Sequence, residues 1–172
     1  NMDSMVNQYT VSKRKRKDDM YSPGGKGGYR PDRATIIYSS KIKEAYSDVP
    51  IILGGIEASL RRFAHYDYWS NKIRRSILLD AKADLIVYGM GEEQIIKIAE
   101  ALESGLPVSE ITFIEGTVYK TKDKKRPYKP IFLPHYDEIL ASKETYAKSF
   151  LIQSNNMDSV VGKPLVEPYR DY

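Results

Sequence analysis

The sequence predicts an α/β fold built around a parallel sheet. Two apolar runs, residues 51–54 and 83–89, have the composition of strands that are buried on both faces. Stretches with helical periodicity lie between and after these runs, and such alternation favours parallel pairing through right-handed crossovers. A third short strand is expected at residues 117–120. Three strands make a narrow sheet, so we expect further strands of the same domain outside this chain.

The first third of the chain predicts two helices separated by a long loop. Residues 1–10 place four apolar side chains at helical spacing, namely Met2, Met5, Val6 and Tyr9. Residues 11–32 carry charges and then the stretch SPGGKGGYRPDR, whose glycines and prolines exclude a regular element. The second helix is expected to start at a capping Asp32 and to end near Tyr46.

Helical patterns also follow the two strands in the centre of the chain. After the first strand they cover residues 57–63 and 67–84, where Ile73, Ile77 and Leu78 share one face. After the second strand a helix is expected over residues 89–105, ending at Gly105. The side chains expected to point inward from this helix are Ile95, Ile98, Ala99 and Leu102.

The character of the sequence changes after residue 120. Charges and three prolines in residues 120–140 predict a surface segment, and residues 137–153 predict one helix. The last residues, 154–172, are expected to form an extended tail that has little to pack against. We therefore divide the chain into a partial α/β domain, residues 1–120, and a linker segment, residues 121–172.

Composition limits the chemistry that this chain can carry. The apolar runs are shorter than the roughly 18 residues of a membrane-spanning helix, so we expect a soluble, cytoplasmic protein. The chain has no cysteine, and its two histidines, His65 and His135, lie far apart in sequence. Neither a thiolate-bound metal cluster nor a structural zinc site is therefore expected.

The net charge of +4 comes largely from two basic segments, residues 12–17 and 120–129. Solvated loops explain both segments most simply. The alternative is a basic, tyrosine-rich module that binds RNA through phosphate contacts and base stacking. The tyrosines that would stack on bases are Tyr9, Tyr21, Tyr29, Tyr119 and Tyr128.

Two glycine turns, GGIEAS and GMGEEQ, follow the two strands directly. Ligands of open parallel sheets bind outside the carboxyl ends of the strands, although a tight turn without a ligand is also an explanation. Both turns lack the glycines and lysine of nucleotide-binding loops, and the second places two carboxylates where a phosphate would lie. The candidate cofactor-binding residues of this crevice are Gly54, Gly55, Glu57, Gly89, Gly91 and Glu92.

The segment RRFAHYDYW, residues 61–69, is expected to form a wall beside the crevice. Its aromatic residues can anchor a loop while its arginines pair with acids, and no nucleophile accompanies its histidine and aspartate. The candidate substrate-binding or docking residues are Arg61, Arg62, His65 and Asp67. The earlier glycine-rich loop suggests either a mobile lid whose Lys26, Arg30 and Arg33 meet an anion, or a plain flexible loop.

Several stretches together resemble the YgiQ-type family of radical S-adenosylmethionine (SAM) proteins. They are NMDSMVNQYT, YSPGGKGGYRPDRATIIY, PIILGGIEASLRRFAHYDYW, RRSILLDAKADLIVYGMGE and EGTVYK. The resemblance implies an incomplete three-layer Rossmann-like domain, of the type that binds cobalamin in other proteins. It also implies a catalytic radical SAM barrel downstream of Tyr172 as the partner of this domain.

The sequence also departs from what the resemblance implies. The CxxxCxxC loop that binds the 4Fe-4S cluster and SAM is absent, so both cofactors are expected only in the rest of the parent protein. The DxHxxG motif of cobalamin domains is absent too, which leaves only cobalamin binding without a protein axial ligand. We therefore expect an accessory domain that frames substrate or cofactor access and has no catalytic residue. RNA binding and a purely structural docking role are the alternatives.

Overall fold

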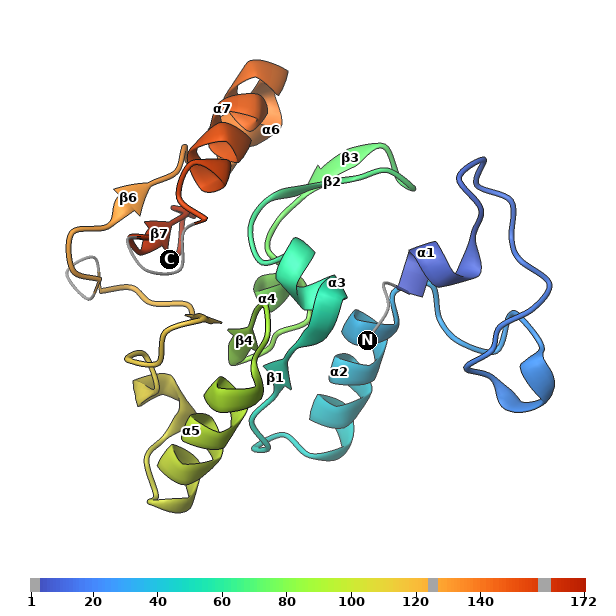
Figure 1. Ribbon diagram of the computed structural model, residues 1–172, viewed down its shortest axis with the longest axis horizontal. Coiled ribbons are helices and arrows are strands. Elements are labelled where there is room, and N and C mark those ends of the chain that lie inside the picture. Colours follow the sequence, from blue (N-terminus) through green and yellow to red (C-terminus); the bar gives the residue numbers. More distant parts are fainter. Residues whose placement is uncertain (1–3, 124–126, 158–161) are drawn as a thin grey trace. The chain divides into compact units, whose positions relative to one another are not determined.

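Figure 1 shows the protein as a computed structural model, which describes residues 4–123, 127–157 and 162–172. The chain folds as two compact units, residues 1–119 and residues 120–172. Predictions that involve Met2 or the centre of the second basic segment, residues 124–126, lie outside the described residues. No described helix has the length and apolar composition needed to cross a membrane.

The first unit is built on a sheet with the strand order β1-β4-β5. These strands are β1 (Ile52–Leu53), β4 (Leu85–Val87) and β5 (Thr117–Val118). Strands β1 and β4 pair in parallel, as predicted, with Ile52 opposite Leu85. Strand β5 runs antiparallel to β4, which differs from the parallel pairing expected for the third strand.

Helices cover both faces of this sheet. One face packs Leu53 and Ile86 against the helices α2 (Ala34–Ala45), α3 (Gly55–Leu60) and α4 (Ile77–Asp80). The other face packs Leu85 and Val87 against α5 (Glu92–Glu103) and the loop that contains the short helix η2 (Val108–Glu110). The sheet therefore lies between two helical layers, in agreement with the predicted incomplete Rossmann-like α/β fold.

Two helices differ in detail from the prediction. Arg33, not Asp32, is the N-cap of α2, and its side chain makes no capping hydrogen bond. In α5, Ile98 is buried and Leu102 is half-buried, but Ile95 and Ala99 are exposed. The narrow sheet accounts for this exposure, because it presents too little surface to cover a wide apolar stripe.

The helix predicted over residues 67–84 is wrong for its first half. Residues 65–74 form an antiparallel hairpin of β2 (His65–Asp67) and β3 (Lys72–Arg74), in which Tyr66 lies opposite Ile73. Asn71 closes the turn with a φ of 53°, a left-handed conformation that asparagine tolerates better than most residues.

The N-terminal segment forms an ordered extension of the first unit. Its elements are α1 (Ser4–Gln8) and the short helix η1 (Pro23–Gly25). Asp19 is buried between them and accepts hydrogen bonds from Arg30 at 2.6 and 2.9 Å, from Asn7 at 3.0 Å and from Ser22 at 2.9 Å. The contacts of Asp19 hold this loop against α1; whether the loop moves as a lid or as a plain flexible loop stays a prediction.

The second unit contains a two-stranded sheet and two helices. Strands β6 (Ile131–Phe132) and β7 (Leu165–Val166) pair in parallel, and the helices α6 (Tyr136–Ala141) and α7 (Lys143–Ser154) contact each other. The single helix predicted here is wrong, because Ser142 adopts an extended conformation that ends α6 and caps α7. The C-terminal tail was expected to have little to pack against, but β7 pairs with β6 and Tyr169 stacks on Tyr136.

Candidate functional site

The two glycine turns lie together at the carboxyl ends of the parallel strands β1 and β4 (Figure 1). Gly55 and Gly89 have φ values of 82° and 73°, which side chains other than glycine rarely adopt. A Cβ atom added to Gly54 would lie 3.8 Å from the carbonyl oxygen of Val87. The sequence therefore placed these turns correctly at one edge of the sheet.

Ser59 connects the two turns. Its hydroxyl group donates a hydrogen bond of 2.8 Å to the carbonyl oxygen of Gly55, one helical turn earlier. It also accepts a hydrogen bond of 3.1 Å from the backbone amide of Gly89. The hydroxyl thus holds α3 against the turn after β4.

The second turn continues into α5 through Gly91, which is the N-cap of that helix. A Cβ atom at Gly91 would lie 2.3 Å from Cγ1 of Val87, so only glycine fits here without a rearrangement. Glu92 is exposed in the first turn of α5. Glu92 is therefore exposed close to the positive end of the helix, where a negative charge is favourable.

Glu57 was expected to line the crevice, but the structure places it inside the protein. Its side chain is buried and accepts hydrogen bonds from Arg61 at 3.0 Å and from the amide and hydroxyl of Ser4 at 3.3 Å each. The negative charge of Glu57 is therefore compensated by Arg61 and by hydrogen bonds from Ser4, all within this chain. Glu57 and Arg61 therefore join α1 to α3, and neither side chain is directed to a ligand by these contacts.

Asp67 is also used internally. Its buried carboxylate accepts hydrogen bonds from Arg33, from the hydroxyl of Ser70 at 2.8 Å and from the amide of Trp69 at 3.1 Å. Burial alone would raise the pKa of Asp67, but the hydrogen bonds from Ser70 and Arg33 outweigh it and lower the pKa to about 2. Arg33, which was suggested as an anion ligand of a lid, is therefore a partner of Asp67.

Arg30, the second arginine expected to bind an anion in a lid, is also paired with a carboxylate of this chain. Its guanidinium group forms two hydrogen bonds with Asp19 and holds the pKa of that carboxylate well below its usual range.

His65 does not pair with Asp67 for catalysis. Its Nδ1 atom lies 3.1 Å from the carbonyl oxygen of Phe63, and burial lowers the pKa of the ring.

Arg62 differs from the other residues of the predicted wall. It donates a hydrogen bond of 2.6 Å to the carbonyl oxygen of Ser59, and its guanidinium carbon lies 5.0 Å from the ring centre of Tyr88 and 5.5 Å from that of Phe63. No carboxylate pairs with Arg62 within the part of the chain that the structure describes. Burial lowers the pKa of this guanidinium group, which shows that its charge is partly desolvated.

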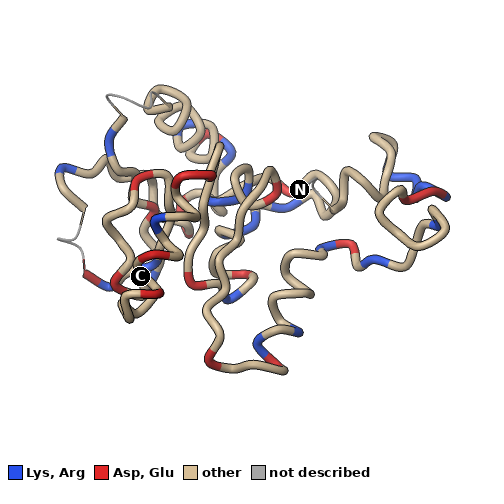
Figure 2. Tube along the Cα trace, turned by 60° about the horizontal axis from the view of Figure 1, so that its bottom comes forward, with Lys and Arg blue, Asp and Glu red and all other residues tan. Residues whose placement is uncertain are grey.

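The basic loop and its aromatic residues pack on one another. Lys13 lies 4.6 Å from the ring centre of Tyr68, and Tyr9 packs on Trp69 at 5.3 Å. Figure 2 marks the basic residues of the chain in blue, among them those of this loop. Because Tyr9 is covered by Trp69, it is a poorer surface for base stacking than its sequence position suggested. RNA binding stays a prediction.

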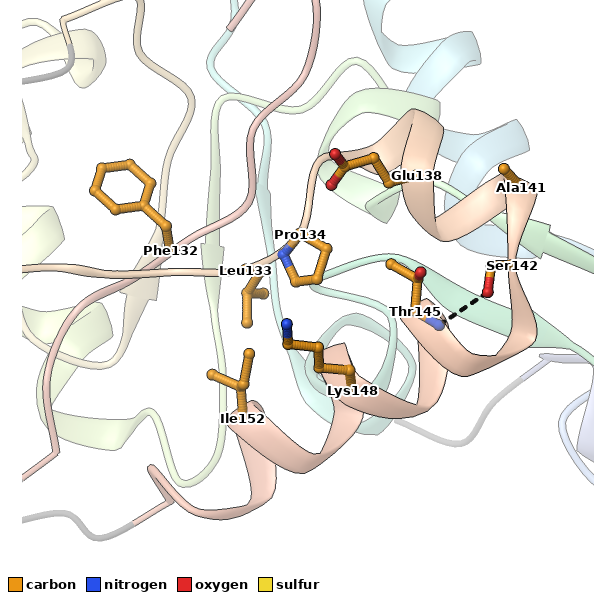
Figure 3. A pocket seen from close by; sticks show the side chains of 9 residues that line it. All are labelled: Phe132, Leu133, Pro134, Glu138, Ala141, Ser142, Thr145, Lys148 and Ile152. Carbon is orange, nitrogen blue, oxygen red and sulfur yellow. Dashed lines mark hydrogen bonds between the residues drawn. The ribbon is translucent and has the colours of Figure 1, made fainter.

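The second unit contains a pocket that the sequence analysis missed. It is an open hollow of about 570 Å³ beside α6 and α7 (Figure 3). Its lining residues are Phe132, Leu133, Pro134, Glu138, Ala141, Ser142, Thr145, Lys148 and Ile152. The prolines and charges of this segment suggested only a surface path, and the pocket arises from the break at Ser142 that turns α7 back against α6.

The residues of this chain do not fit an iron–sulfur cluster. The sequence offers no cysteine thiolate, which is the ligand that such clusters require. Within residues 4–123, 127–157 and 162–172, no three His, Asp or Glu side chains gather closely enough to hold a metal ion. Residues 1–172 therefore offer no thiolate ligand for such a cluster.

Sequence reasoning also missed Ser59 and Tyr88. A signal for Ser59 was present, because a serine four residues after Gly55 in a helix can return its hydroxyl to that carbonyl group. The contact of Tyr88 with Arg62 had no local signal, since it joins residues from two elements.

Comparison with known proteins places the chain in a family. Residues 1–172 match the Radical SAM N-terminal family. A UPF0313 protein of Clostridium botulinum (strain ATCC 19397 / Type A) is 54% identical over 171 residues, which cover 99% of this chain and 26% of the relative. A UPF0313 protein of Clostridium perfringens (strain ATCC 13124) is 54% identical over 170 residues, 98% of this chain and 26% of the relative. No solved structure matches significantly. The chain spans about a quarter of these relatives and belongs to the Radical SAM N-terminal family.

Proposed function

We propose that this chain is the accessory N-terminal domain of a YgiQ-type radical SAM enzyme. In this proposal the carboxyl edge of its sheet frames the access of substrate or cofactor to a catalytic barrel in the rest of the polypeptide. When bound in that barrel, a 4Fe-4S cluster and SAM would supply the radical chemistry. Residues 1–172 contribute no cluster ligand and are not catalytic by themselves.

The observation that carries this proposal is the pair of glycine turns joined by Ser59. Together, Gly55, Ser59 and Gly89 form a hydrogen-bonded edge at the end of two parallel strands, where ligands of open sheets bind. Pockets also form preferentially at domain interfaces. The UPF0313 relatives, of which this chain covers 26%, are long enough to hold a further domain beside this edge.

The full-length protein allows a direct test. Ser59→Ala removes the link between the turns, and Ser104→Ala removes an exposed hydroxyl at the end of α5 as a matched control. We expect Ser59→Ala to retain the iron content of the wild type but to form 5′-deoxyadenosine from SAM about 3- to 10-fold more slowly, the effect of losing about 1 kcal/mol of positioning. Equal rates for both variants would contradict a role of this edge in access.

A further inference from the structure

Exposed apolar side chains lie on α3 and on the turn after β4, the two segments that Arg62 contacts at the carboxyl edge of the sheet. Ile56 and Leu60 lie one turn apart on α3 and are 57% and 68% exposed. Tyr88 and Met90 lie in the turn after β4 and are 37% and 88% exposed. The Ser59 hydroxyl of α3 accepts a hydrogen bond from the Gly89 amide in this turn, so the two segments that carry these pairs lie side by side. We call these four apolar residues, together with Arg62, the edge patch.

Exposed apolar side chains in such a group are typical of interaction surfaces. Because Arg62 is positively charged, a partner that covers this surface is expected to carry a negative charge opposite it. Its guanidinium group is half-buried against Tyr88, has one hydrogen bond to a carbonyl group, and has no carboxylate partner among the described residues. A partly desolvated guanidinium group is stabilised most by a carboxylate that binds two of its N–H groups in one plane.

Three carboxylates of the second unit have polar partners within that unit. Asp137 pairs with Arg170 at 2.6 Å, Glu144 accepts from Ser142 at 2.7 Å and Glu167 accepts from Tyr169 at 2.8 Å. The relatives, in contrast, are much longer than this chain, which covers 26% of their length. Most of the surface available to the edge patch in such a protein therefore lies outside residues 1–172.

We propose that the edge patch docks an apolar segment of the same polypeptide, from beyond residue 172, that carries an aspartate or glutamate facing Arg62. This inference rests on the proposed function, because it assumes that the chain is one domain of a longer protein. Docking here would bring the rest of the polypeptide against the two glycine turns. The crevice would then be a gap between domains, closed on one side by the ion pair of Arg62.

Site-specific photocrosslinking in the full-length protein tests the docking. The crosslinking residue p-benzoylphenylalanine replaces Leu60 or Met90 in turn, and replaces the exposed Val11 as a control away from the sheet edge. We expect Leu60 and Met90 to give intramolecular crosslinks to a peptide beyond residue 172 with an aspartate or glutamate nearby, at a yield several-fold above that at Val11. Crosslinks to residues 120–172 or to a second copy, or no crosslinks above the control, would overturn the proposal.

The charge of Arg62 is tested in the same crosslinking protein. Arg62→Gln is expected to lower the crosslink yield at Leu60 at least threefold, and Arg62→Lys to lower it less. Lys97→Gln, on the exposed face of α5, serves as the control and should leave the yield unchanged. An unchanged yield in Arg62→Gln overturns the carboxylate partner. Iron content and SAM cleavage, measured on the same samples, report separately on the proposed function.

Discussion

The hydroxyl group of Ser59 accepts a hydrogen bond of 3.1 Å from the backbone amide of Gly89. The two residues are 30 positions apart, and they belong to the helix that follows β1 and to the turn that follows β4. One side chain therefore couples the two turns that define the edge of the sheet.

Ser59→Ala is expected to loosen the turn after β4 without unfolding the sheet. A lost hydrogen bond of this kind costs about 1 kcal/mol, which corresponds to roughly fivefold faster amide exchange. Hydrogen exchange followed by mass spectrometry should show this increase in peptides covering residues 88–91, and not in peptides from α5. Unchanged exchange at Gly89 would show that backbone geometry alone fixes the turn.

Asp19→Asn is expected to release the N-terminal loop. Asp19 is buried and pairs with Arg30, so its neutral replacement leaves a partly buried guanidinium group without a counter-charge. Limited digestion with trypsin should then cut the basic segment 12–17 several-fold faster than in the wild type. Asp18→Asn, at the exposed neighbouring position, is the control. Equal cleavage of the two variants would exclude the proposed role of Asp19.

The lowered pKa of Asp67 predicts that the folded protein loses stability in acid. The pKa of its carboxylate is lowered from 3.8 to about 2 in the folded protein, so the unfolded chain binds the proton more tightly. The stabilisation is complete above about pH 5 and is lost as the pH falls from about 4 to 2, with an upper limit of roughly 2 kcal/mol. Urea unfolding of the 172-residue chain can be followed through its single tryptophan, Trp69.

Comparison with Asp67→Asn isolates this contribution. The variant should be less stable than the wild type at pH 6, because Arg33 and Ser70 lose a charged partner. The difference between the two proteins should shrink as the pH approaches 2. A difference that stays constant from pH 6 to pH 3 would rule out the lowered pKa of Asp67 as its cause.

Local patterns were sufficient to predict the central framework of this fold. The apolar runs at β1 and β4 have few alternatives to buried strands, and Gly54, Gly55 and Gly89 mark their ends. The hairpin of β2 and β3 was missed because Ile73, Ile77 and Leu78 happen to fit a helical period as well. Periodicity alone could not distinguish a helix from a hairpin over residues 65–74. The turn at Asn71 produces the hairpin.

The candidate site was predicted less well than the fold, because burial depends on residues that are distant in sequence. Glu57 was assigned to the crevice because it follows the glycines in sequence. In the structure its side chain is buried and accepts a hydrogen bond from Ser4, which lies 53 residues earlier. Arg33 and Asp67, 34 residues apart, form a pair that no local pattern reveals. Arg62 became distinct from Arg61 only when the partner of each could be identified.

We propose that this chain is an accessory domain of a radical SAM enzyme whose cluster ligands lie outside residues 1–172. The most direct measurement compares the full-length protein with residues 1–172 after anaerobic reconstitution with iron and sulfide. We expect the full-length protein to show the electron paramagnetic resonance signal of a reduced 4Fe-4S cluster and to cleave SAM to 5′-deoxyadenosine, while residues 1–172 do neither. A full-length protein that lacks both the cluster and SAM cleavage would contradict the claim.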